Sequence, residues 1–196
     1  MALSPGFADP VLEAQSAFRS IMEASARPGT VCPLDSTLAP PAPLSRGAAV
    51  IALTLFDQDT AVWLDAPLAG DDLTYWLRFH TRAPVVTDPQ RAAFAILSRP
   101  EQAPPFDAFA LGTLEYPDRS TTLILQVDSL ERGRPLVLTG PGIKDRVTLR
   151  AEPLPADLPR QLAANRALFP RGIDLLLVTG SRVAALPRSV TLTEEA

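Results

Sequence analysis

The stretch Thr121-Thr-Leu-Ile-Leu-Gln-Val127 decides the fold class of this chain. Its β-branched and leucine side chains form an apolar run of strand length, which indicates a buried strand. Comparable apolar runs occur at residues 61–64, 92–97, 135–139 and 173–179. Helical patterns separate the early runs, whereas the late runs follow one another closely. This order predicts an α/β fold with a mixed sheet covered by helices.

Four segments have the spacing of apolar residues that indicates a helix. In the first, Asp9 is expected to cap the helix and Pro10 to occupy its first position. Pro28-Gly29 is expected to end it. Ser45 is expected to cap a second helix that reaches Phe56, Asp71-Asp72 to open a third that runs toward Phe79, and residues 159–168 to form a fourth.

Turn signals predict how the late strands pair. Residues 129–133 read as a turn, so the runs at 121–127 and 135–139 are expected to pair as antiparallel strands. Gly180-Ser181 predicts a compact hairpin between the runs that flank it, residues 173–179 and 183–186. Short strands are also expected at residues 30–34 and 146–150.

The chain has 196 residues but only one lysine (Lys144), one histidine (His80) and one cysteine (Cys32). A zinc site needs several His or Cys ligands and an iron–sulfur cluster needs several Cys, so both are disfavoured. A pyridoxal phosphate enzyme would have to use Lys144 for its Schiff base, and a serine triad would have to use His80 as its base. Few catalytic sites remain, which makes a subunit role a serious candidate. The length fits a single domain over residues 1–196.

Charge and hydropathy narrow the partners and the location. The net charge of −4 argues against nucleic-acid binding, and one cysteine excludes an intramolecular disulfide. The opening Met-Ala-Leu-Ser-Pro-Gly-Phe lacks the basic region and long apolar run of a secretory signal. The longest apolar stretch, near residues 48–56, is too short to cross a bilayer. We therefore expect a cytoplasmic protein that does not insert into membranes.

The densest polar segment is Arg78-Phe-His-Thr-Arg82. In an extended segment Arg78, His80 and Arg82 would share one face, because strand side chains alternate. With Thr81 they would then be candidates for binding a phosphate or a phosphonate. In a helix these side chains would not line up, and His80 would instead be a cap or a hydrogen-bond donor within the fold.

The second candidate for anion binding is the loop Thr139-Gly-Pro-Gly142-Ile, where Gly140 and Gly142 would let backbone N–H groups approach an anion. A plain turn is the alternative, since the loop has neither a Walker motif nor GxGxxG. Lys144 follows at once, but the neighbouring Asp145 favours a solvated loop over a Schiff-base pocket. Glu115 and Asp118 could act as an acid–base pair or form a polar turn, and Asp174 at a strand start could cap the strand or pair with an arginine.

Several segments, taken in order along the chain, resemble one family. They are Ala14-Gln-Ser-Ala-Phe-Arg19 with Pro28-Gly29, Ala52-Leu-Thr-Leu-Phe-Asp-Gln-Asp-Thr60 with Val62-Trp63-Leu64, Leu77-Arg-Phe-His-Thr81 with Ala83-Pro84, Gly112-Thr113, Thr122-Leu-Ile-Leu-Gln-Val127, Leu138-Thr-Gly-Pro-Gly-Ile143, Phe169-Pro170, Gly172-Ile-Asp-Leu175 and Leu186-Pro-Arg188. This ordered set resembles the PhnH family, the H subunit of bacterial carbon–phosphorus lyase.

The resemblance implies a three-layer α/β fold with helices on both faces of a mixed sheet, like the large domain of type I pyridoxal-phosphate transferases but without the cofactor. It also implies a homodimer in isolation and, in the cell, a complex with the G, I and J subunits, with the L subunit also required. That complex forms ribose 1-alkylphosphonate 5-triphosphate from ATP and an alkylphosphonate and releases adenine. The aromatic residues Trp63, Tyr75, Trp76 and Phe79 are expected at an interface or in the core.

Three functions follow as hypotheses. The first is an accessory subunit without turnover of its own. The second is a subunit that binds the nucleotide or the phosphonate through Arg78, His80 and the loop from Gly140 to Gly142. The third is an independent pyridoxal phosphate enzyme that uses Lys144, which the sequence disfavours. The family resemblance assigns no catalytic residue to this chain.

Overall fold

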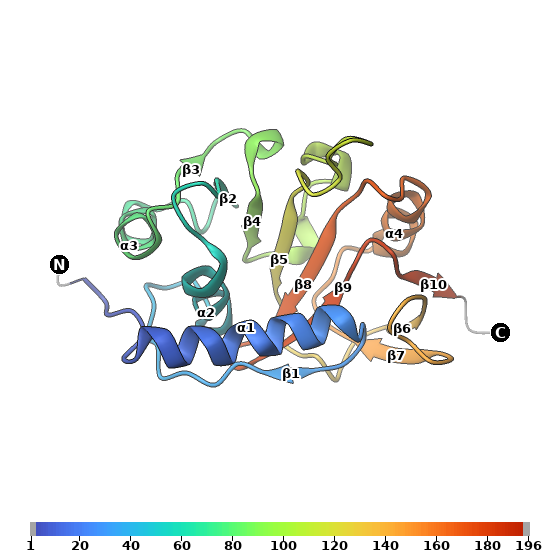
Figure 1. The fold of residues 1–196 in the computed structure, drawn as a ribbon, viewed down its shortest axis with the longest axis horizontal. Helices are drawn as coiled ribbons and strands as arrows, with labels where there is room; N and C mark the ends of the chain where they lie inside the picture. Colours follow the sequence, from blue (N-terminus) through green and yellow to red (C-terminus); the bar gives the residue numbers. More distant parts are fainter. Residues whose placement is uncertain (1–2, 194–196) are drawn as a thin grey trace.

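The computed structural model describes residues 3–193, so that Met1 and Ala2 of the opening segment lie outside it. Its centre is a seven-stranded sheet in the order β1-β9-β8-β5-β4-β2-β3 (Figure 1). The five strands β2, β3, β4, β5 and β8 are parallel to one another, whereas β9 pairs antiparallel with β8 on one side and with β1 on the other. The strands are β1 (Cys32–Pro33), β2 (Val62–Leu64), β3 (Val85–Val86), β4 (Phe94–Leu97), β5 (Thr122–Gln126), β8 (Asp174–Val178) and β9 (Arg182–Leu186).

The helices begin where the sequence signals predicted. The Asp9 side chain accepts a hydrogen bond from the Leu12 N–H, and the Ser45 side chain accepts one from the Ala48 N–H, so both cap their helices as expected. The helices are α1 (Pro10–Ala26), α2 (Arg46–Leu55), α3 (Asp71–Thr81) and α4 (Leu158–Ala167), with short 3₁₀ helices at Pro89–Arg91, Pro100–Gln102 and Phe106–Ala108.

A second, three-stranded sheet has the order β10-β6-β7, with β6 (Pro135–Thr139), β7 (Val147–Arg150) and β10 (Thr191–Thr193). The expected pairing of residues 121–127 with 135–139 is therefore wrong, because β5 and β6 lie in different sheets. The alternation of β5 explains this: Ile124 faces one core while Leu123 and Leu125 face the other, and a strand buried on both faces belongs inside a parallel sheet. The β8–β9 hairpin and the strand near residues 146–150 are confirmed.

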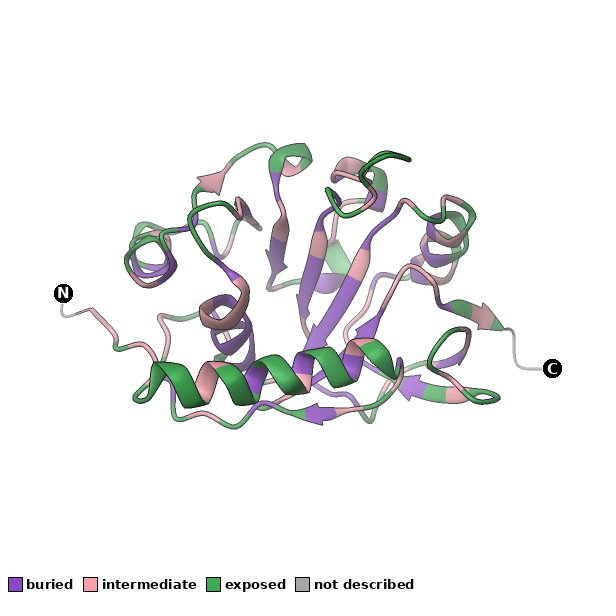
Figure 2. Ribbon diagram, in the orientation of Figure 1, coloured by how far each residue is buried: buried purple, intermediate pink, exposed green. Residues whose placement is uncertain are grey.

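The large sheet separates two apolar cores. Helices α1, α2 and α3 cover one face, and α4 with the small sheet covers the other, which gives three layers. Figure 2 shows the central strands buried between these layers and most of the outer surface of α1 exposed. The prediction of a mixed α/β fold with a large mixed sheet is confirmed. Among residues 3–193, no helix is long and apolar enough to cross a membrane.

Helix α2 packs against the end of β8 without a side chain between them. A Cβ atom added to Gly47 would lie 2.1 Å from the Thr179 carbonyl oxygen and 2.6 Å from Cγ2 of Val178. The backbone oxygen cannot move aside as a flexible side chain could, so only glycine allows this approach. The contact fixes the height of α2 above the sheet.

We predict that Gly47→Ala lowers the free energy of unfolding by roughly 1–3 kcal/mol, because the added methyl group overpacks a backbone contact. Helix propensity alone would act in the opposite direction by about 1 kcal/mol. Urea unfolding measures the difference. Gly180→Ala is the control, since a Cβ atom there meets nothing within 4 Å, and equal stability of the two variants would contradict the prediction.

Candidate functional site

The segment from Arg78 to Thr81 forms the last turn of α3, so its extended arrangement is ruled out. Leu73, Trp76 and Leu77 are buried at helical spacing, and this apolar stripe keeps the segment helical through Thr81. Side chains two positions apart in an α-helix point roughly 200° away from each other. Arg78 and His80 therefore do not share a face.

His80 holds the N-terminal segment of the chain against α3. Its Nε2 atom lies 3.0 Å from the Ser4 carbonyl oxygen, which also accepts a hydrogen bond of 2.8 Å from Nε1 of Trp76. Because a carbonyl oxygen only accepts, we infer that Nε2 of His80 carries the hydrogen. The Nδ1 face leaves no room for a side chain at Gly6, where an added Cβ atom would lie 2.9 Å away. This arrangement corresponds to the hydrogen-bond donor alternative for His80.

Thr81 and Arg82 end the helix. Oγ1 of Thr81 donates to the Leu77 carbonyl oxygen and accepts from the Ala83 N–H, at 2.7 and 3.1 Å. Arg82 adopts the left-handed conformation that closes many helices, with φ of 62°. Arg78 and Arg82 are both exposed, and neither has an ion pair within residues 3–193, so each keeps a guanidinium available to a ligand.

The glycine loop between β6 and β7 packs closely against the end of α1 and does not form an open anion-binding site. Gly140 and Gly142 have positive φ values of 133° and 82°. A Cβ atom on Gly142 would lie 2.1 Å from the Ala26 carbonyl oxygen at the end of α1. Figure 1 shows α3 and the β6–β7 region at opposite ends of the molecule, so the two predicted anion-binding segments are not brought together. Lys144 and Asp145 are both exposed in the same loop.

The remaining reactive side chains lie apart from one another. Glu115 and Asp118 are exposed, and the structure gives them no base or acid partner among the described residues. Burial, followed by the charge of Glu23, raises the pKa of the Cys32 thiol, so its thiolate form is disfavoured. Among residues 3–193 there is also no group of His, Cys, Asp and Glu side chains that could hold a metal ion.

The strongest polar cluster surrounds Arg188, just after β9. Its Nε and Nη2 atoms donate to the Asp174 carboxylate, and its backbone N–H donates to the same group at 2.7 Å. Nη1 donates to the carbonyl oxygens of Pro117 and Pro170, at 2.7 and 3.3 Å, and Nη2 also donates to Ser120. One guanidinium thus joins the start of β8, the end of β9 and two loops. The interpretation of Asp174 as a partner for an arginine is confirmed.

The carboxyl edge of the parallel strands is where open α/β sheets usually bind ligands. Asp65, after β2, accepts from the Ser98 N–H and hydroxyl and from the Arg99 N–H. Oε1 of Gln126 accepts from the Ser45 N–H. Sequence reasoning missed Asp65 because a lone acid after a short strand is a common turn residue. Its acceptors are already used to join β2 to β4, so it leaves little for a ligand.

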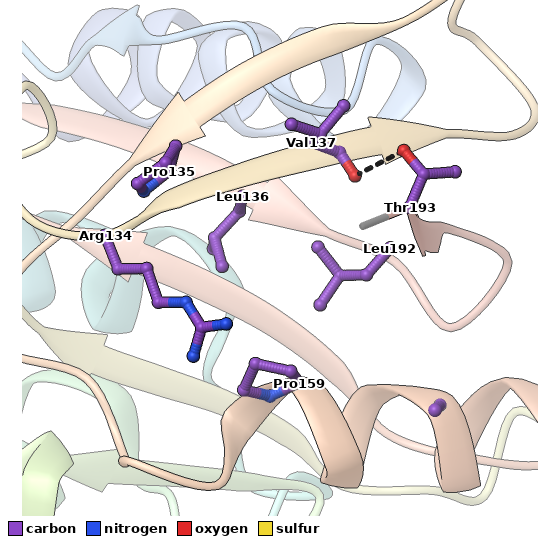
Figure 3. A pocket seen from close by; sticks show the side chains of 8 residues that line it. Arg134, Pro135, Leu136, Val137, Pro159, Leu192 and Thr193 are labelled. Carbon is purple, nitrogen blue, oxygen red and sulfur yellow. Dashed lines mark hydrogen bonds between the residues drawn. The ribbon is translucent and has the colours of Figure 1, made fainter. Parts of the chain in front are cut away.

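An open hollow lies between the small sheet and α4 (Figure 3). Its volume is about 560 Å³, and Arg134, Leu136, Leu192 and Pro159 point toward it. Thr193 forms the rim, where its hydroxyl donates to the Val137 carbonyl oxygen at 3.3 Å. A second hollow of about 400 Å³ continues past Arg134 and Pro159. Nothing in the sequence singled out Arg134, because it follows a turn glycine among several other arginines.

We predict that Arg188→Ala lowers the free energy of unfolding by roughly 2–4 kcal/mol, because the Asp174 carboxylate keeps only the backbone N–H of residue 188 and three other acceptors lose the guanidinium donor. Thermal or urea unfolding tests this. The control is Arg27→Ala, which removes an exposed pair with Glu23 and should change stability by less than about 0.5 kcal/mol. Similar losses in the two variants would show that the Arg188 cluster is not a stabilising centre.

The sequence matches known relatives along nearly the whole chain. Residues 5–193 match the family model described as bacterial phosphonate metabolism protein (PhnH). The chain is 48% identical over 192 residues to the alpha-D-ribose 1-methylphosphonate 5-triphosphate synthase subunit PhnH of Rhizobium meliloti, which covers 98% of this chain and 96% of the relative. It is 34% identical over 180 residues to the putative C-P lyase subunit protein HtxG of Stutzerimonas stutzeri, covering 89% and 83% of the two chains. The chain therefore belongs to the PhnH family.

Proposed function

We propose that this protein is a subunit of the carbon–phosphorus lyase complex and that it supports formation of ribose 1-alkylphosphonate 5-triphosphate from ATP and an alkylphosphonate, with release of adenine. The observation that carries the proposal is the family match over residues 5–193, together with the 48% identity to a PhnH subunit of the ribose 1-methylphosphonate 5-triphosphate synthase. The reaction belongs to the complex, and this chain contributes to it without turnover of its own.

The local chemistry supports an accessory role. The single histidine is engaged with the Ser4 main chain, the single cysteine is buried, and the single lysine is exposed in a loop. Nucleophilic and acid–base catalysis both need such groups placed close together. The alternative, direct binding of nucleotide or phosphonate, would rely on Arg78 without help from Gly140 or Gly142, and it is less favoured.

The finer expectations from the family belong to the same proposal. They are a homodimer in isolation, and a complex with the G, I and J subunits in which the L subunit also takes part. Exposed apolar side chains on α1 support a role in protein contacts: Val11, Leu12, Phe18 and Met22 are all exposed. Among the aromatic residues expected at an interface or in the core, Tyr75 and Phe79 are exposed, whereas Trp76 is fully buried and Trp63 packs edge-on against Phe109.

We further propose that the fold is related to the large domain of type I pyridoxal-phosphate transferases and binds no pyridoxal phosphate. The residues present do not fit that cofactor. Its Schiff-base lysine needs a desolvated pocket, and Lys144 is exposed beside the exposed Asp145.

The proposal predicts that the G, I and J subunits co-purify with this chain and that the complex, assayed with the L subunit, releases adenine from ATP when methylphosphonate is present. Omitting this chain should abolish adenine release, and adding it back should restore the activity. This chain alone should release no adenine. Full activity of the other subunits in its absence would overturn the proposal, as would failure of this chain to join them.

For the cofactor, we predict that mixing the purified chain with pyridoxal phosphate gives no absorbance band of an internal aldimine, because the amine of Lys144 is solvated. The spectrum before and after borohydride reduction provides the measurement. Lys144→Ala serves as the control. A band that is present in the natural chain and lost in this variant would contradict the prediction.

A further inference from the structure

Arg134, beside the hollow between the small sheet and α4, differs from other arginines of this part of the fold because it has no partner among the described residues. Arg132 pairs with Glu152 at 3.0 Å and Arg160 pairs with Asp157 at 2.9 Å. Arg182 pairs with Glu131, and Arg150 donates to the Gly133 carbonyl oxygen at 2.9 Å. Arg134 has neither an ion pair nor a side-chain hydrogen bond within residues 3–193, and it is the one that points into the hollow (Figure 3).

Apolar side chains lie on either side of this guanidinium, with Thr193 at the rim of the first hollow and Glu152, which is paired with Arg132, beside the second. Leu136 from β6, Leu192 from β10, and Pro159 and Ala163 from α4 line the first hollow. Leu154, Pro155 and Leu158 line its continuation past Arg134. The two hollows share Arg134, Leu136 and Pro159, so they form one groove with Arg134 at its middle; the Glu152 carboxylate that also lines it is already paired with Arg132.

We propose that this groove, hereafter the Arg134 groove, binds an apolar segment of another subunit that carries one carboxylate facing Arg134. This inference rests on the proposed function as a subunit of the lyase complex. Charge complementarity selects the carboxylate, and the leucine and proline walls select the apolar side chains that flank it. The segment belongs to the G, I or J subunit.

Two other occupants fit the groove less well. A phosphate or phosphonate needs several converging donors, and the groove offers one guanidinium, since the Thr193 hydroxyl already donates to Val137. The chain's own residues Glu194 and Glu195, which follow Thr193 in the sequence, would supply carboxylates. Neither glutamate brings a large apolar side chain for the leucine and proline walls.

The test is Arg134→Glu in the assembled complex. We expect retention of the G, I and J subunits on tagged chain to fall by about one to two orders of magnitude in affinity, because a charge-assisted contact is replaced by repulsion. Arg146→Glu is the matched control: Arg146 is exposed, precedes β7, has no ion pair among the described residues and lines neither hollow. It should assemble normally, and both variants should keep their melting temperature.

A steric pair of variants tests the same groove without changing charge. Ala163→Trp fills the first hollow and should also weaken assembly. Ala164 lies one position further along α4 and lines a different cavity beside Asp157 and Leu168. The control variant Ala164→Trp should therefore not weaken assembly. This pair decides the outcome if Arg134→Glu fails to fold.

Normal assembly of both Arg134→Glu and Ala163→Trp would overturn the inference and leave the proposed function standing. Equal loss with Arg146→Glu would also overturn it, because overall charge would then explain the effect. A melting temperature that falls in Arg134→Glu and equally in Glu194→Gln with Glu195→Gln would assign the groove to the chain's own tail instead. Failure of the natural chain to assemble would refute the proposed function, and the inference with it.

Discussion

The structure depends on burying the central strands on both faces. Ile124 on β5 enters the core beneath α1, α2 and α3, while its neighbours Leu123 and Leu125 enter the core beneath α4 and the small sheet. Such strands are stable only if both faces are kept from water, so neither layer is optional. The small sheet is therefore part of the cover and not an appendage, and its residues Leu136, Leu138 and Leu149 are buried with those of the central strands.

The Arg188 cluster holds together the chain segments that meet at the start of β8 and just after the end of β9. Strands β8 and β9 run antiparallel at the end of an otherwise parallel set, and two loops must cross over the place where they meet. A single guanidinium offers five N–H donors in a fixed plane, enough to satisfy the Asp174 carboxylate and the carbonyl oxygens of both loops. Three of the family-like segments, at residues 169–170, 172–175 and 186–188, meet at this point.

Local sequence signals predicted where the helices and strands lie better than they predicted which strands pair with one another. The caps at Asp9 and Ser45 and the β8–β9 hairpin act over a few residues, and each was predicted correctly. The partner of β6 was not, because two strands that flank a turn pair only if nothing else needs their edges. Both edges of β5 are occupied by the parallel strands β4 and β8. These strands lie about 30 and 50 residues away along the chain, so no local signal indicates the pairing. The sequence also leaves open whether residues 78–81 are helical or extended. Burial of Trp76 and Leu77 on one face of α3 decides for the helix, and which side chains are buried is known only from the fold.

For the candidate site, the sequence indicated which residues could matter, but it did not indicate which atoms they contact. His80 stands in the family-like segment from Leu77 to Thr81, yet its partner is the Ser4 carbonyl oxygen, a main-chain atom that no residue pattern marks. Asp174 was predictable as an ion-pair partner because acid at a strand start has few other roles. Arg134 was not predictable, since what distinguishes it from its neighbours is the lack of an ion pair among residues 3–193, a property of the fold. In a chain whose single histidine, cysteine and lysine are engaged, buried or isolated, exposed arginines without an ion pair are the charged groups best placed to recognise an acidic group outside the fold. Arg78 and Arg134 are both exposed, but Arg78 stands at a helix end, whereas Arg134 stands in a groove beside leucine and proline side chains that can pack against the segment carrying a bound carboxylate. The physical argument for recognition is therefore stronger at Arg134.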